Sequence, residues 1–253
     1  MNHKPWQAIF DKYKIYEHDF SKNPFVISAE QIKNATVHFT STTEREVRVL
    51  CKQDSRKDRP QIFLENNLFI LPIKNGKYAI LQGEGYIDIP AIITEATHYH
   101  SKLDFELETS QVGNSEMQHL DFAYASSLIR SFLQDESLVL TIRGRKYTPR
   151  FEFYAGQYRQ LMIAESVQTE VDAGYEGRNQ VVLIEAKNTS TTNTIIRQLY
   201  YPYRQWQTHT NKKVNVLFFE KRGSIYLLWE FSFADNMDYH SIELLKSAKF
   251  EIK

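Results

Sequence analysis

The sequence predicts a mixed α/β protein of the α+β kind, with a central mixed β-sheet flanked by helices and an N-terminal α+β domain in front of it. Three observations support this prediction. Helical and strand-like patterns alternate from residue 115 onward. The pair Asn75-Gly76 separates two apolar runs, as in a β-hairpin. Aromatic residues make up 13% of the chain, which suits half-buried strands.

Residues 1–105 are expected to form the N-terminal α+β domain. Residues 5–20 have the apolar spacing of a short amphipathic helix. Ser28 followed by Gln31 has the pattern of a capping box, which predicts a second short helix. The hairpin at Asn75-Gly76 then supplies the first strands of this domain.

Residues 106–253 are expected to form the second domain, which carries the central sheet. Its predicted elements are a helix over 115–133, two strands around a basic loop within 137–156, strands within 161–176 and 179–187, a helix over 193–210, and a hairpin over 213–233. Pro202 is expected to kink the helix over 193–210, because proline removes one backbone hydrogen bond.

Composition limits the classes of protein to be considered. The chain has 31 basic and 31 acidic residues, so any nucleic-acid contact must come from local clusters of cations. A single cysteine, Cys51, excludes a disulfide framework and a thiolate zinc site. The first twenty residues lack the apolar core of a secretory signal, and no apolar run is long enough to span a membrane. We therefore expect a cytoplasmic protein.

An unusual group of charges lies at the ends of two predicted strands. In residues 180–187, "QVVLIEAK", alternation places Glu185 and Lys187 on the same face as Val181 and Leu183. The opposite face is wholly apolar, so the strand is expected to be buried on both sides. Charges at the end of a buried strand are costly unless other groups compensate them.

A second carboxylate precedes this strand. Twelve residues separate Asp172 from Glu185, which is enough for two antiparallel strands and a turn to bring the carboxylates side by side. Two like charges held together destabilise each other unless a cation lies between them. Mg²⁺ suits such a site, because it binds one or two carboxylates and keeps water and phosphate oxygens as its other ligands. A lysine beside it can orient the attacking water or offset charge that develops on a phosphate.

Asp172 with Glu185-Ala186-Lys187 resembles the PD-(D/E)-x-K nuclease superfamily, and in particular its type II restriction endonucleases and resolvase-like enzymes. The resemblance covers residues 115–233, and Val171 stands where the motif has proline. It implies a restriction endonuclease-like core in which Asp172 and Glu185 bind Mg²⁺ and Lys187 is the third catalytic group. The simplest alternative is an edge strand that ends in a surface salt bridge.

The resemblance also implies two supporting groups. The superfamily often adds an acid from the preceding helix, for which Glu116 and Asp121 are candidates. Asp121 is preferred as a metal ligand because it follows Leu120 within the helical pattern. A polar residue on the helix after the lysine commonly serves the site, and Gln198 is the candidate here.

Two basic clusters are candidates for DNA contact. The first contains Arg143, Arg145 and Lys146, with both arginines on one face of a strand. The second contains Lys52, Arg56, Lys57 and Arg59, of which Arg56 and Lys57 are the candidates. The alternative for either cluster is a solvated turn.

Together these features predict a Mg²⁺-dependent DNA endonuclease, most simply a type II restriction enzyme that cuts double-stranded DNA at a specific sequence. The N-terminal domain is expected to recognise the DNA. Cutting both strands calls for two active sites, hence a homodimer, and a cognate DNA methyltransferase is the expected genetic partner. The alternatives are a structure-directed nuclease of the resolvase or repair type, and an inactive nuclease fold that only binds DNA.

Overall fold

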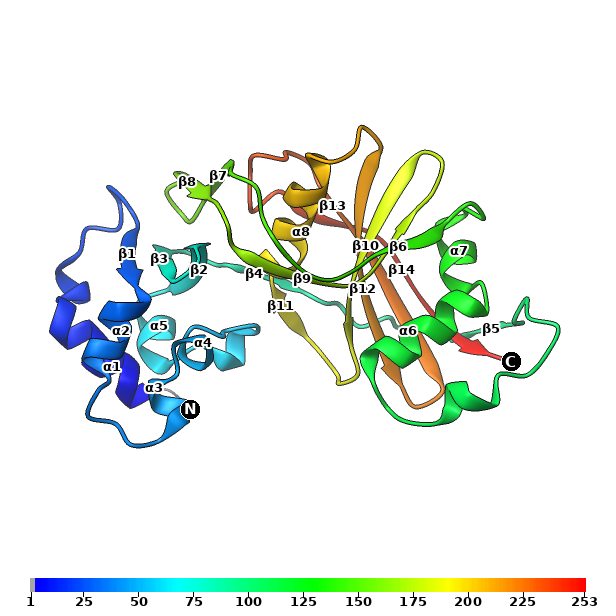
Figure 1. The fold of residues 1–253 in the computed structure, drawn as a ribbon, viewed down its shortest axis with the longest axis horizontal. Coiled ribbons are helices and arrows are strands. Elements are labelled where there is room, and N and C mark those ends of the chain that lie inside the picture. Colours follow the sequence, from blue (N-terminus) through cyan, green and yellow to red (C-terminus); the bar gives the residue numbers. More distant parts are fainter. Residues whose placement is uncertain (1–2) are drawn as a thin grey trace.

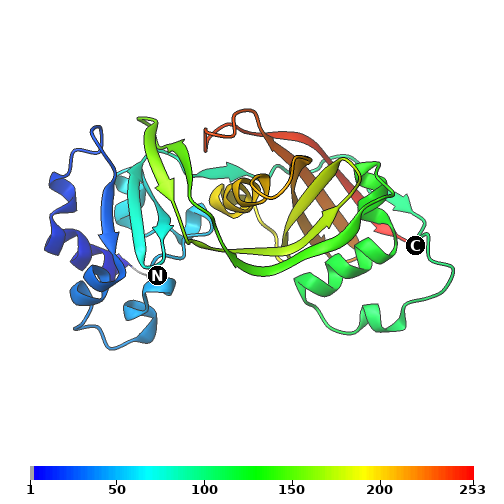
Figure 2. The same cartoon turned by 45° about the horizontal axis from the view of Figure 1, so that its top comes forward.

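The computed structural model describes residues 3–253, which form two units lying side by side (Figure 1). We call residues 3–82 the N-terminal unit and residues 83–253 the C-terminal unit. Short helices and a small sheet make up the N-terminal unit at one end of the molecule. A large twisted sheet dominates the other end (Figure 2).

A three-stranded antiparallel sheet, in the order β1-β3-β2, organises the N-terminal unit. Helices pack against one face of this sheet around a core that includes Trp6, Phe10 and Phe63. The elements of the unit are α1 (His3–Tyr13), η1 (Ile15–Glu17), β1 (Phe25–Ser28), α2 (Ala29–Ala35), α3 (Thr42–Arg45), α4 (Val47–Leu50), η2 (Arg56–Asp58), α5 (Gln61–Glu65), β2 (Leu68–Lys74) and β3 (Lys77–Gln82).

Local sequence signals explain several of these elements. The predicted capping box is confirmed: the Gln31 N–H donates to Ser28 Oγ over 3.1 Å, and the Ser28 N–H donates to Gln31 Oε1 over 2.8 Å. The hairpin at Asn75-Gly76 is confirmed as β2–β3, with Gly76 at a φ of +73°. Helix α1 is shorter than the predicted helix over 5–20, because Lys14 adopts a left-handed conformation that ends it.

The C-terminal unit is built on a seven-stranded mixed sheet in the order β5-β14-β13-β12-β10-β9-β6. Two neighbouring pairs, β10/β12 and β14/β5, are parallel, and the others are antiparallel. The strands of this sheet are β5 (Thr97–Tyr99), β6 (Val139–Tyr147), β9 (Gln168–Glu176), β10 (Gln180–Lys187), β12 (Lys213–Arg222), β13 (Ile225–Phe233) and β14 (Ile242–Ile252).

Helices cover both faces of the sheet, which confirms the predicted fold class. One face packs against α6 (Glu116–Ala125) and α7 (Leu128–Leu133), and the other against α8 (Arg197–Gln207). Helix α8 connects the parallel strands β10 and β12 (Figure 1). The remaining elements are η3 (Glu108–Gln111) and the two-stranded pairs β4 (Tyr86–Asp88) with β11 (Asn193–Ile195) and β7 (Phe151–Ala155) with β8 (Gln160–Ala164).

Three predicted elements of this unit differ from the structure. The helix over 115–133 is divided into α6 and α7, because Ser127 is left-handed with a φ of +67°. The segment 161–176 is divided into β8 and β9 around Ser166, which has a φ of +53°. The basic residues expected in a loop lie on β6, which continues through Gly144 by means of register shifts.

The hairpin β2–β3 belongs to the cores of both units. Its side chains alternate between two sides. Leu68, Ile70 and Ile80 pack within the N-terminal unit, whereas Phe69 and Leu71 pack against the C-terminal unit. An apolar contact of this kind favours a fixed arrangement of the two units over free movement.

Strand pairing passes to the C-terminal unit before the domain boundary expected at residue 105. Strands β4 and β5 lie before residue 105. They nevertheless pair with β11 and β14, which belong to the C-terminal unit. Within residues 3–253, no helix is long and apolar enough to cross a membrane.

Candidate functional site

The candidate site lies where β9 and β10 separate. The two strands are antiparallel neighbours, as predicted, and their pairing ends at Ala173 and Ile184. Beyond this point, the Ala186 N–H has a side chain of β9 as its partner and no longer the main chain. It donates a hydrogen bond of 2.7 Å to Asp172 Oδ2. Strand β10 continues beside β12 as far as Lys187. This separation leaves room for the side chains of Asp172, Glu185 and Lys187 between two interior strands of the sheet.

The predicted alternation along β10 is confirmed by the two cores. Val181 and Leu183 pack on the α8 side of the sheet, whereas Val182, Ile184 and Ala186 pack on the α6 side. Glu185 and Lys187 share the α8 side by the same alternation. Strand β10 is therefore buried on both faces, and its polar end must find partners within the protein.

Glu185 has two such partners. Its carboxylate forms an ion pair with the Lys187 ammonium, and its Oε1 also accepts a hydrogen bond of 2.8 Å from Gln198 Nε2. The Thr194 hydroxyl donates to Gln198 Oε1 over 2.6 Å, which turns the Gln198 amide nitrogen toward Glu185. Gln198 thus occupies the supporting position expected for it, one residue into α8.

Burial changes the acidity of the central groups. It raises the pKa of the Glu185 carboxyl to about 7, even though the Lys187 ammonium lies beside it. Burial likewise raises the pKa of Asp172, against the opposing effects of the Ala186 N–H and Lys187. Burial disfavours the Lys187 ammonium, but the attraction of Glu185, Asp172 and Glu116 outweighs it and raises the pKa of Lys187. The site therefore combines the half-buried Lys187 ammonium with two carboxyl groups whose negative charges it offsets only in part.

The acid that joins this site from the preceding helix is Glu116, and not the preferred candidate Asp121. Glu116 Oε1 accepts a hydrogen bond of 3.2 Å from the Asn188 N–H, directly after Lys187. Its charge acts on both Asp172 and Lys187. Asp121 instead forms an ion pair with Arg143 on β6. Residues five apart on a helix point about 140° away from each other, so the two acids cannot face the same site.

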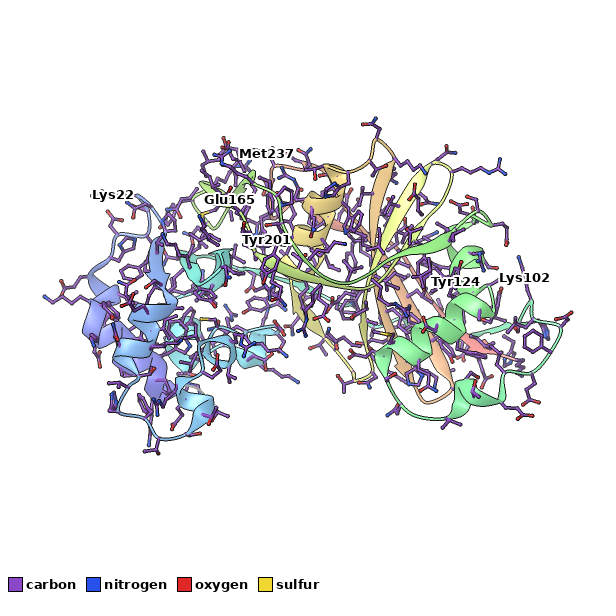
Figure 3. All side chains as sticks on the ribbon, in the orientation of Figure 1. Lys22, Lys102, Tyr124, Glu165, Tyr201 and Met237 are labelled. Atoms are coloured by element: carbon purple, nitrogen blue, oxygen red, sulfur yellow. The ribbon has the colours of Figure 1, made fainter. Side chains whose placement is uncertain are left out.

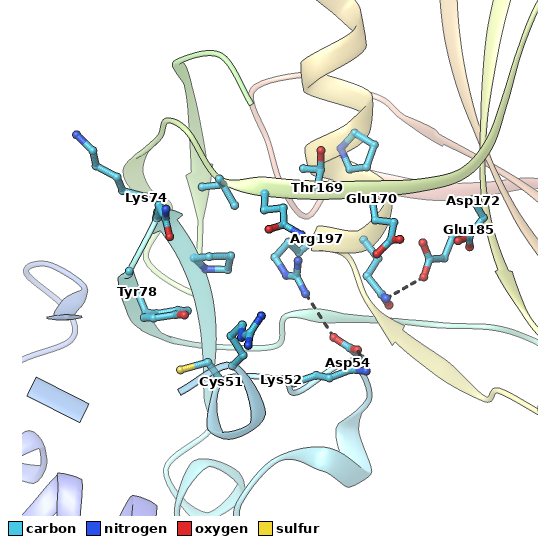
Figure 4. A pocket seen from close by; sticks show the side chains of 18 of the residues that line it. Cys51, Lys52, Asp54, Lys74, Tyr78, Thr169, Glu170, Asp172, Glu185 and Arg197 are labelled. Carbon is cyan, nitrogen blue, oxygen red and sulfur yellow. Dashed lines mark hydrogen bonds and ion pairs between the residues drawn. The ribbon is translucent and has the colours of Figure 1, made fainter. Parts of the chain in front are cut away.

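A cleft between the two units opens onto these residues, with a volume of about 540 Å³. Figure 4 shows Asp172 and Glu185 at one side of it and Cys51, Lys52 and Asp54 of the N-terminal unit at the other. The Arg197 guanidinium spans the two sides through an ion pair of 3.3 Å with Asp54. The N-terminal unit therefore forms one wall of the site.

The cations predicted to contact DNA lie elsewhere. Arg143 is paired with Asp121, and Arg145 with Glu170 at 3.1 Å. Lys146 lies 6.0 Å from the centre of the Trp206 ring, and Arg56 is paired with Glu84 and Asp88. Lys57 is exposed next to it. Among the residues that the structure describes, none of these five lines the cleft.

Sequence reasoning missed three cations that line the cleft: Arg48, Lys74 and Arg197. A fourth, Lys52, belongs to the second basic cluster but was not among the residues expected to contact DNA. Arg197 had a usable signal, because it directly precedes Gln198 at the start of the helix. Arg48 and Lys74 come from separate segments of the N-terminal unit, so no spacing in the sequence connects them with Asp172 or Glu185.

The donors at the site suit a hard divalent cation. Across residues 3–253, no group of three or more His, Cys, Asp or Glu side chains is placed to hold a metal ion. Mg²⁺ needs fewer protein ligands, since it usually binds one or two carboxylates together with several waters. Asp172 and Glu185 provide oxygen donors of that kind, and the raised pKa of Glu185 is what a nearby cation would lower.

Comparison with known families places the chain but assigns no activity. Residues 81–251 match the model of a domain of unknown function, DUF6997, which covers more than half of the chain. The chain belongs to the DUF6997 family. Residues 3–80 match a second domain of unknown function, DUF6996. The point where the two matches meet lies within the shared hairpin, at β3. No curated protein and no solved structure matches the chain.

Proposed function

We propose that this DUF6997 protein is a Mg²⁺-dependent DNA endonuclease with a PD-(D/E)-x-K type of site. The observation that supports the proposal most directly is the pairing of β9 with β10, because Asp172, Glu185 and Lys187 come together where this pairing ends. Gln198 and Glu116 complete the group, and all five residues line one cleft. A salt bridge at a surface-edge strand would need neither the burial of Glu185 nor these additional partners.

Each side chain has a role in this proposal. Asp172 and Glu185 would hold Mg²⁺, which when bound lowers the pKa of water and polarises a phosphoryl oxygen. The Lys187 ammonium would orient the attacking water and offset the charge that develops on the scissile phosphate. Gln198 fixes the orientation of the Glu185 carboxylate through its hydrogen bond of 2.8 Å.

The substrate and partners belong to the same proposal. A type II restriction enzyme in the cytoplasm would cut double-stranded DNA at a specific sequence, act as a homodimer and be encoded beside a DNA methyltransferase. The N-terminal unit, which forms one wall of the cleft, would contact the DNA.

The test is to incubate the purified protein with plasmid DNA in Mg²⁺ and in EDTA. Discrete fragments that form only in Mg²⁺ are the expected result. Cleavage confined to branched DNA would instead indicate a structure-directed nuclease. DNA that stays intact on plasmid and branched substrates alike would contradict the nuclease proposal.

The choice between the two helix acids gives a separate prediction. We expect Glu116→Gln to lower the cleavage rate roughly 10–100-fold, as is typical when a group that supports metal ligands is lost. Asp121→Asn is the matched control on the same helix and should leave the rate nearly unchanged. A larger loss in Asp121→Asn than in Glu116→Gln, measured on the same plasmid, would reverse the assignment.

A further inference from the structure

The wall of the cleft opposite the candidate catalytic residues carries three cations. Arg48 lies on α4, Lys52 follows that helix, and Lys74 ends β2. Their side chains are 88%, 72% and 56% exposed, in that order. Figure 4 shows Lys52 close to Asp54. Lys74 lies further than Lys52 from Asp172 and Glu185, so the cations are spread along the cleft.

Charge is divided unequally between the two walls. The lining residues of the C-terminal unit include four acids and two cations: Glu116, Glu170, Asp172, Glu185, Lys187 and Arg197. Those of the N-terminal unit include the three cations and a single acid, Asp54, which is paired with Arg197 at 3.3 Å. A polyanion that enters the cleft is thus repelled by one wall and attracted by the other.

These three cations are held only loosely by their present partners. Arg48 lies 3.5 Å from Glu46, Lys52 lies 3.7 Å from Asp54, and Lys74 lies 3.9 Å from Glu165. Exposed pairs of this kind contribute about 0–1 kcal/mol, so exchanging a carboxylate for a phosphate costs little. Arg143, by contrast, forms a close ion pair with Asp121 on the surface of the C-terminal unit and does not line the cleft.

We propose that Arg48, Lys52 and Lys74 form a phosphate-binding wall that holds the DNA backbone across the cleft from Asp172, Glu185 and Lys187. This inference rests on the proposed function, because it takes DNA as the substrate. Contacts to phosphate position a strand without reading its sequence. The wall therefore supplies affinity and places a phosphate near Lys187, while sequence recognition would come from other groups.

The test measures binding of a fluorescein-labelled DNA duplex in EDTA by fluorescence anisotropy, at salt concentrations from about 50 to 200 mM. The variant combines Arg48→Gln, Lys52→Gln and Lys74→Gln. Each lost phosphate contact is expected to reduce the slope of log K against log salt by about 1, so the triple variant should lose about 3. The single change Lys52→Gln should lose about 1 by the same reasoning.

The matched control removes three exposed lysines from the same unit without touching the cleft: Lys4→Gln, Lys22→Gln and Lys33→Gln. Figure 3 shows Lys22 at the outer end of the N-terminal unit, away from the C-terminal unit. This control should keep the wild-type slope and affinity. The phosphate-binding wall is refuted if the cleft variants keep the wild-type slope, if the control loses as much, or if the wild type binds no duplex at low salt.

Failure of the wall and failure of the nuclease proposal give different results. If the wild type cleaves plasmid in Mg²⁺ and the triple variant keeps the wild-type slope of log K against log salt, only the proposed phosphate-binding wall is refuted. A cleft variant that loses its salt slope, together with a wild type that cuts no DNA, overturns only the nuclease proposal. Melting temperatures from circular dichroism establish that each variant is folded.

Discussion

Replacing Lys187 with alanine is expected to lower the rate of plasmid cleavage roughly 10²–10³-fold, the usual cost of removing one group that stabilises transition-state charge. DNA binding in EDTA should change little, because Lys187 is 25% exposed and is held by Glu185 at the inner end of the cleft. Cleavage and binding are measured on the same preparation. A variant that cleaves as fast as the wild type would remove Lys187 from the mechanism.

Two comparisons keep this result interpretable. Lys213→Ala removes an exposed lysine from the opposite end of the same strand pair, where Lys213 lies beside Gln180, and should cleave at the wild-type rate. Losing one partner of a buried ion pair can destabilise a protein by about 3–5 kcal/mol. Glu185 can limit that loss by taking up a proton, since its pKa already lies near 7. The melting temperature of Lys187→Ala should therefore remain measurable and show a folded protein.

The part of the site that the sequence predicts correctly depends on the two-residue period of a strand. That period separates Val181 and Leu183 from Val182 and Ile184, and the two cores confirm the division. It also fixes Glu185 and Lys187 on one face. The short, turn-prone segment between Gly177 and Gln180 makes antiparallel pairing with β9 the natural outcome, which brings Asp172 to Ala186.

The choice between Glu116 and Asp121 could not be made in the same way. A helical pattern shows which face of the helix is apolar, but not where along the sheet the helix packs. That position depends on contacts such as the one between Glu116 and the Asn188 N–H, which are 72 residues apart in the chain. The break at Ser127, a left-handed serine, likewise has no clear signal in the sequence.

The residues proposed to contact DNA were also beyond the reach of sequence patterns. The sequence highlights runs of cations, such as Arg143 to Lys146, but on β6 such residues pair with acids on neighbouring elements. Three cations of the cleft come from α4, the segment after it and the end of β2. Packing of the shared hairpin between the two units brings them to the site. The role proposed for them therefore rests on tertiary structure and has no signal in the sequence.

The raised pKa of Glu185 predicts how stability depends on pH and on Mg²⁺. In the metal-free protein the folded state binds this proton more tightly than the unfolded chain, because the pKa rises from 4.5 to about 7 on folding. The contribution of Glu185 to stability is therefore full below pH 4.5 and is lost as the pH rises through 7. This rise in pKa corresponds to a contribution of roughly 3 kcal/mol to the free energy of unfolding at low pH.

Magnesium should reverse this trend, because it binds the deprotonated carboxylate. At a Mg²⁺ concentration 100-fold above Kd, binding adds about 2.7 kcal/mol of stability, or roughly 5–10 °C in melting temperature for a chain of this size. We expect this gain in thermal melts above pH 7, and its loss below pH 6, where the proton occupies Glu185. Cleavage should decline over the same range.

Glu185→Gln separates this effect from general acid sensitivity. The amide cannot titrate, so the variant should lose the pH-dependent part of its stability between pH 5 and 8, along with the gain from Mg²⁺. The matched control is Glu230→Gln, which changes another buried carboxyl of the same sheet, one paired with Lys246 at 3.3 Å and outside the cleft. It should keep the Mg²⁺ response of the wild type. If Glu185→Gln keeps that response as well, the cation binds elsewhere, and the buried carboxylate at the end of β10 serves only its ion pair with Lys187.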